Sequence, residues 1–150
     1  MANTQALCTS AKVELLNGIH AMGTSVVRAG TGADTFKAAL FLASATINAS
    51  TATYSTTGEV TGTNYTAGGV TFTWIAPSSS GTTAFSTPSA SFSWTTVTLS
   101  TAFDCVQTYN STQGNKSFSV HTFGSTTITA GNFSLTMPAN DSSNALVRLA

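Results

Sequence analysis

The sequence predicts a mainly β protein: a single antiparallel β-sandwich, Ig-like or jelly-roll-like, with one short N-terminal helix. Three observations support this fold class. From residue 36 onward apolar residues alternate with polar ones, which is the period of a strand buried on one face. Glycine- and serine-rich segments separate the alternating runs. About a third of the 150 residues are Ser or Thr, and β-branched Thr favours strands.

Residues 1–35 are predicted to form a helical and extended appendage to a β-sandwich domain over residues 36–150. A helix is expected over residues 9–22, because a Thr-Ser pair can cap its start and apolar residues recur at helical spacing. This apolar stripe must be buried, either against the sandwich of the same chain or against an adjacent subunit. It is therefore a candidate attachment helix, formed by Leu15, Ile19 and Met22.

Each expected strand has apolar side chains on one face and hydroxyl groups on the other, as in sheets that face water on one side. In the strand expected near residues 118–121, Ser119 and His121 occupy the polar face. Trp74 and Trp94 each end an alternating aromatic run and are predicted to share the core. The strands are expected near residues 36–42, 70–74, 90–94, 118–121, 133–137 and 146–149, with turns at 58–69, 77–81, 110–115 and 130–132.

The charge pattern excludes several classes of partner. The formal net charge is zero, from five basic and five acidic side chains, and no basic cluster exists to neutralise phosphates or anionic lipids. We therefore expect no nucleic-acid partner and no membrane partner. No apolar run is long enough for a transmembrane helix, and the N-terminus lacks the features of a signal peptide. Assembly in a cytoplasm is expected, with Cys8 and Cys105 reduced.

The sequence offers little chemistry, and no catalytic, cofactor-binding or metal-binding residue is predicted. The carboxylates are far apart in the sequence. A Cys2His2 zinc set lacks the locally spaced pairs of structural zinc sites. No G-x-S-x-G motif marks a nucleophile, and Gly30-Thr31-Gly32 does not extend to a phosphate-binding loop. A non-enzymatic protein is expected, although a pocket with His121 beside a carboxylate would point to a hydrolase. The carboxylates are Glu14, Asp34, Glu59, Asp104 and Asp141, and the zinc set would be Cys8, His20, Cys105 and His121.

Several stretches resemble small structural proteins of tailed-bacteriophage particles. They are ELLNGIH (14–20), FKAALF (36–41), GTNYTAGGV (62–70), YNSTQGNKSFSVHTFG (109–124) and TAGNFSLTMP (129–138). The resemblance implies a structural virion component made in the host cytoplasm. A capsid decoration or cement protein is favoured, with the major capsid protein and further copies of itself as partners. The alternative is a receptor- or carbohydrate-binding module of a tail or fibre. The resemblance implies no site residues and no cofactor.

Overall fold

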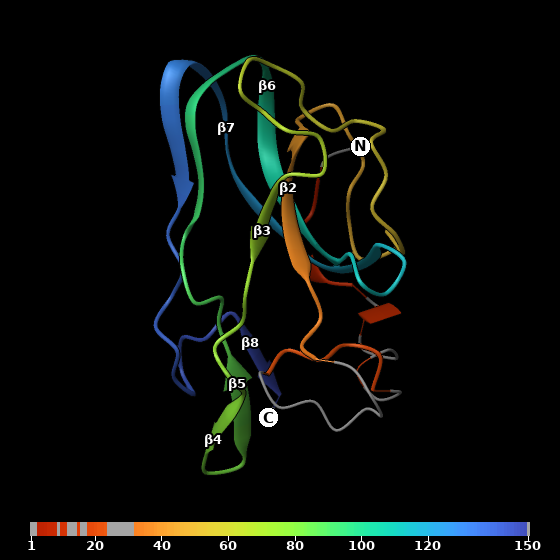
Figure 1. Ribbon diagram of the computed structural model, residues 1–150, viewed down its shortest axis with the longest axis vertical. Helices are drawn as coiled ribbons and strands as arrows, with labels where there is room; N and C mark the ends of the chain where they lie inside the picture. Colours follow the sequence, from red (N-terminus) through yellow and green to blue (C-terminus); the bar gives the residue numbers. More distant parts are fainter. Residues whose placement is uncertain (1–2, 9, 12–14, 16–17, 24–31, 150) are drawn as a thin grey trace.

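The protein is described by a computed structural model over residues 3–8, 10–11, 15, 18–23 and 32–149, shown in Figure 1. Two antiparallel sheets, of five and three strands, have the orders β1-β7-β6-β2-β3 and β4-β5-β8. The predicted mainly β class is confirmed. The strands are β1 (Ala6–Leu7), β2 (Phe36–Leu42), β3 (Val70–Phe72), β4 (Ser78–Ser80), β5 (Thr83–Ser86), β6 (Phe92–Asn110), β7 (Lys116–Leu135) and β8 (Val147–Leu149).

Two long strands, β6 and β7, form the hairpin around which the protein is built, with 19 and 20 residues. The sequence predicted short strands here and a turn at residues 130–132, and this prediction is wrong. The Thr-rich stretches between the aromatic runs continue the strands, as their β-branched side chains favour. Ala130 does adopt a left-handed conformation, with φ of 45°, but as an irregularity within β7 and not as the end of a strand.

The β6–β7 ribbon folds back on itself, so that its two halves face each other (Figure 1). Phe103 pairs with Thr126, yet its ring centroid lies 5.0 Å from that of Phe133. A straight strand would separate residues 126 and 133 by about 23 Å. The β6–β7 register shifts repeatedly between Trp94 and Cys105, and such irregularities let a ribbon bend sharply.

The loop between β2 and β3 pairs with the sheet at several places, one of which is the bridge between Thr63 and Thr98 of β6. Val60 N donates to Leu40 O at 3.0 Å, which continues the edge pairing of β2 beyond β3. Near the opposite edge of the sheet, Ser117 N of β7 donates to Ala52 O at 3.0 Å. The glycines of this loop allow close approach: a Cβ on Gly69 (φ 72°) would lie 1.8 Å from Ala38 O. Residues 58–69, which were predicted as a turn, are therefore part of an ordered loop that packs on the sheet.

Both tryptophans lie in one hydrophobic core, as predicted. Trp74 is 5% exposed and Trp94 is 4% exposed. Phe36 lies at the centre of the aromatic packing, with ring centroids 5.7 Å from Trp74 and 5.7 Å from Phe118. The two indole N–H groups have no hydrogen-bond partner in the described part of the chain. The tryptophans therefore stabilise the core through apolar packing.

The helix expected over residues 9–22 falls in part on residues 9, 12–14 and 16–17, which are outside the described part. No helix extends from Gly18 to Met22, so the predicted C-terminal boundary is wrong. Gly18 has φ of 66° and its N–H donates to Leu15 O at 3.1 Å, which closes a turn. Leu15 and Met22 pack partly buried against the core of their own chain, and Ile19 is half-buried. Their role in attachment to a neighbour stays a prediction. No helix in the described part is long and apolar enough to span a membrane.

Candidate functional site

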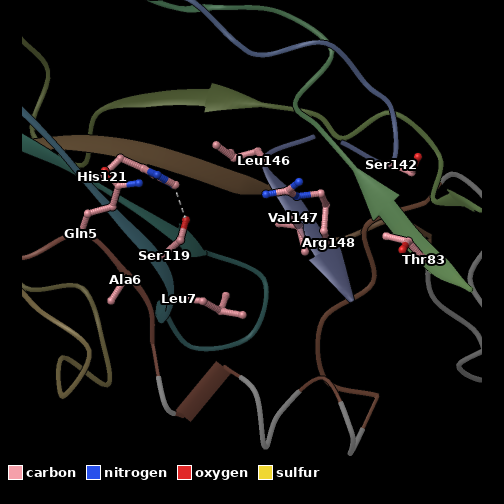
Figure 2. A pocket seen from close by; sticks show the side chains of 10 residues that line it. All are labelled: Gln5, Ala6, Leu7, Thr83, Ser119, His121, Ser142, Leu146, Val147 and Arg148. Atoms are coloured by element: carbon pink, nitrogen blue, oxygen red, sulfur yellow. Dashed lines mark hydrogen bonds between the residues drawn. The ribbon is translucent and has the colours of Figure 1, made fainter. Parts of the chain in front are cut away.

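A groove of about 510 Å³ lies between the β1–β7 edge of the large sheet and β8 of the small one (Figure 2). The pairing of Leu7 with Ser119 brings β1 alongside β7, while β8 is held by its pairing with β5. Polar and apolar side chains contribute to the wall in similar measure. The lining residues are Gln5, Ala6, Leu7, Thr83, Ser119, His121, Ser142, Leu146, Val147 and Arg148.

The strand period explains why Ser119 and His121 meet in this groove. They are two residues apart on β7, so their side chains project to the same face. Figure 2 shows the hydrogen bond that joins them, with Ser119 Oγ 2.8 Å from His121 Nε2. The sequence correctly placed both on one polar face of the strand. It gave no sign that this face would be covered by β8 and enclosed as a groove.

A hydrogen-bonded chain runs from the interior of the sheet to the groove. Thr108 Oγ1 lies 2.6 Å from Ser119 Oγ and also accepts from Ser119 N at 3.1 Å. Ser119 itself is 3% exposed. Burial lowers the pKa of His121 to about 4, so the imidazole is neutral at pH 7. The groove therefore presents a neutral imidazole whose Nε2 is already engaged by a buried hydroxyl.

A serine hydroxyl beside a neutral imidazole supplies two of the groups of a nucleophilic hydrolase. The third is missing from this wall, since no carboxylate lines the groove among the described residues. Ser119 Oγ is also held between Thr108 and His121 and is nearly inaccessible. The charged group of the wall is Arg148, whose guanidinium donates to Ser143 O. The arrangement suits binding of a polar group better than attack on one.

One carboxylate, that of Glu59, lies within the loop between β2 and β3. Glu59 is 6% exposed and accepts from Tyr54 OH at 2.6 Å, Tyr65 OH at 2.7 Å and Gly68 N at 2.8 Å. Burial, and then the hydrogen bond to Glu59, raises the pKa of both phenols well above the ordinary value. The carboxylate thus joins three parts of this loop to one another and fixes the loop's shape.

A second carboxylate, Asp34, fastens the N-terminal segment to the end of the β6–β7 hairpin. Its Oδ2 accepts from Asn110 Nδ2 at 2.7 Å, and its Oδ1 accepts from Gln113 Nε2 at 3.2 Å. The same Asn110 amide lies 3.2 Å from His20 Nδ1. His20 is buried and packs edge-on against Phe118 at 5.2 Å. No sequence signal indicated this cluster, because its members are far apart along the chain.

The remaining described carboxylates have similar structural partners. Asp104 accepts from Asn3 Nδ2, which links the N-terminal segment to β6. Asp141 Oδ1 accepts from Ser143 N at 2.8 Å and from Asn144 N at 2.7 Å, which shapes the turn before β8. Glu14 is outside the described residues. The carboxylates that the structure describes are thus spread over four places, each fastening a loop or a terminal segment.

The nominal zinc set is not assembled. Cys8 Sγ points at Asn48 O at 3.9 Å, while His20 and His121 have the separate partners described above. Burial raises the pKa of Cys105 to about 12, which keeps its sulfur protonated. Within the described part, no three His, Cys, Asp or Glu side chains are grouped so that they could hold a metal ion.

No protein-family model, curated protein or solved structure matches this chain.

Proposed function

We propose that this chain is a structural component of a tailed-phage virion, a capsid decoration or cement protein that binds the capsid shell and neighbouring copies. The main support for this proposal is the structural role of the carboxylates. Each one in the described part accepts hydrogen bonds that fasten a loop or a terminal segment. The few ionisable groups thus stabilise loops and terminal segments. A subunit that is repeated many times over a shell requires such a rigid structure.

The surface chemistry supports the same function. Charged residues make up 7% of the chain, against about 25% in ordinary soluble domains. Weakly charged subunits can crowd on a particle without strong mutual repulsion. In this proposal the protein resides in the virion, which is assembled in the host cytoplasm, and its main partner is the major capsid protein.

We extend the proposal to the finer fold, a sandwich of Ig-like or jelly-roll-like type. The packing of Phe133 on Phe103, and of Phe92 on Phe72 at 4.7 Å, supports two layers that face each other across an aromatic core. A two-layered body of this kind presents broad strand faces, which are suitable for contact with a shell and with neighbouring subunits.

The groove favours one alternative, a receptor- or carbohydrate-binding module of a tail or fibre. Gln5, Thr83 and Arg148 offer hydrogen-bonding groups around a concave surface, as sugar sites do. Against this alternative, Trp74 and Trp94 are buried and unavailable for stacking on a sugar ring. The shell function is therefore preferred.

The test is to locate the chain in gradient-purified particles of the phage that encodes it. Mass spectrometry should find it in many copies, and immunogold labelling should place it over the head. Labelling confined to the tail, together with glycan-array binding that is lost in Arg148→Ala, would establish the alternative. Absence of the chain from purified particles would overturn both.

A further inference from the structure

The groove between the large sheet and β8 has the size of a small-molecule site. Its volume of about 510 Å³ falls in the range of about 300–1,000 Å³ that such sites occupy. β7 contributes Ser119 and His121 to its wall, and β8 contributes Val147 and Arg148. In Figure 2 the side chain of Arg148 extends from β8 into the space between the two strands. A molecule bound in the groove would therefore contact both sheets.

The hydrogen-bonded chain behind the groove determines the tautomer of His121. Thr108 Oγ1 accepts from Ser119 N, which leaves its own proton to be donated. Ser119 Oγ is 2.6 Å away and Ser119 O is 3.4 Å away, and hydroxyl donors prefer distances below about 3.0 Å. Thr108 therefore donates to Ser119 Oγ, and Ser119 in turn donates to His121 Nε2 at 2.8 Å. The neutral imidazole then carries its proton on Nδ1. Within the part of the chain that the structure describes, this N–H group has no hydrogen-bond partner.

Arg148 supplies the charge of the groove. Its exposed guanidinium donates to Ser143 O, and a guanidinium has five N–H donors, so most of them are available to a ligand. Hydrogen bonds from Asn144 and Ser143, and to a smaller extent the charge of Arg148, lower the pKa of Asp141. The Asp141 oxygens nevertheless accept from Ser143 N and from Asn144. Arg148 therefore remains able to pair with a carboxylate from outside the chain.

The groove also has an apolar part. Leu7 of β1 and Leu146, next to β8, line it and are only partly buried. Val147 lies between Leu146 and Arg148 in the sequence and adds a further apolar side chain to the wall. An apolar group bound here would cover these side chains, while its polar end could reach Arg148.

We propose that the groove binds a small monocarboxylate with an apolar body, held at its carboxylate by the Arg148 guanidinium and the His121 Nδ1–H. The planar fork of an arginine matches the two oxygens of a carboxylate. One positive charge and one neutral donor balance a single negative charge, which favours a carboxylate over a phosphate dianion. Thr108 and Ser119 act as positioning residues, because they fix which ring nitrogen carries the proton.

This inference does not depend on where the chain resides in a particle, and it is tested on the purified full-length chain. Proton–nitrogen correlation NMR during titration with sodium hexanoate should show saturable shifts at groove amides, including those of Leu7, His121 and Val147. Hexanamide has the same length but no charge, and it should bind at least about tenfold more weakly, because the charge-assisted hydrogen bonds are lost. Inorganic phosphate should also bind more weakly than hexanoate.

Two charge-removing variants separate a defined site from general attraction. Arg148→Gln should weaken hexanoate binding at least about tenfold. Lys116→Gln is the matched control, because it removes one positive charge from β7 at a residue that does not line the groove, and it should bind hexanoate as the unmodified chain does. Circular dichroism verifies that both variants fold. Nitrogen NMR of the imidazole should find the His121 proton on Nδ1, with a change in its signal when hexanoate is added.

Three results would overturn the inference: no saturable shifts with hexanoate, equal binding of hexanamide, or an equal loss of binding in Arg148→Gln and Lys116→Gln. A proton on Nε2 of His121 would overturn the donor role of that residue. None of these results bears on the place of the chain in the virion, which the particle experiment decides separately.

Discussion

Phe103 packs against Phe133, with ring centroids 5.0 Å apart, although its own strand partner is Thr126. This contact exists only because the β6–β7 ribbon doubles over. It joins the largely buried inner half of the ribbon to its partly exposed outer half. The folded-back arrangement therefore depends on aromatic contacts and not on continuous strand pairing alone.

Replacing Phe103 should therefore destabilise the protein strongly. Phe103→Ala leaves a cavity at a site that is 0% exposed and should lower the free energy of unfolding by about 3–5 kcal/mol. Phe85→Ala, on the half-buried β5, is the control and should cost clearly less. Urea unfolding followed by fluorescence measures both, and equal effects would contradict the central place of Phe103 in the core.

Glu59→Gln should loosen the loop between β2 and β3. The carboxylate accepts three hydrogen bonds from Tyr54, Tyr65 and Gly68, whereas a Gln side chain has one acceptor oxygen and adds an N–H group that needs a partner. We expect a loss of roughly 2–4 kcal/mol. Asp141→Asn, at an exposed turn, is the control and should change the free energy of unfolding much less. Thermal unfolding with unchanged Tm in Glu59→Gln would refute the structural role of the carboxylate.

Stability should depend on pH through His121. Burial places its pKa near 4 in the folded state, below the value of about 6.5 expected in the unfolded chain. The unfolded state therefore binds the proton more readily between these values, and stability falls as the pH is lowered from about 6.5 to about 4. The loss is at most about 3 kcal/mol. His121→Gln can keep the hydrogen bond to Ser119 and should show a shallower decline in urea unfolding over this range. Identical pH profiles would show that His121 does not titrate as its burial requires.

Two glycines with similar backbone angles should respond differently to alanine. Gly69 has φ of 72° and a Cβ there would lie 1.8 Å from Ala38 O, so Gly69→Ala must displace the backbone of β2. Gly114 has φ of 67° and a Cβ there would meet nothing within 4 Å. Gly114→Ala should cost only the left-handed strain of about 1–2 kcal/mol, whereas Gly69→Ala should cost more than about 3 kcal/mol. Equal melting temperatures would show that the loop does not approach β2 this closely.

The sequence by itself determined the local features of this protein. The alternation around Phe72, Trp74, Phe92 and Trp94 identified strands and the side chains that fill the core, because the two-residue period of a strand fixes which face is apolar. The polar face shared by Ser119 and His121 follows from the same period.

Only the tertiary structure decided which distant segments meet. The fold-back that brings Phe133 onto Phe103 is accompanied by shifts of register within the ribbon, which have no signature in residue type. The partners of Glu59 and Asp34, and the cover that β8 places over His121, depend on contacts between segments far apart in the chain. The position of β7 in the sheet was likewise decided only by the tertiary structure. Whether a strand is enclosed or left at a margin depends on the order of strands in the sheet, and a local apolar pattern carries no information about that order.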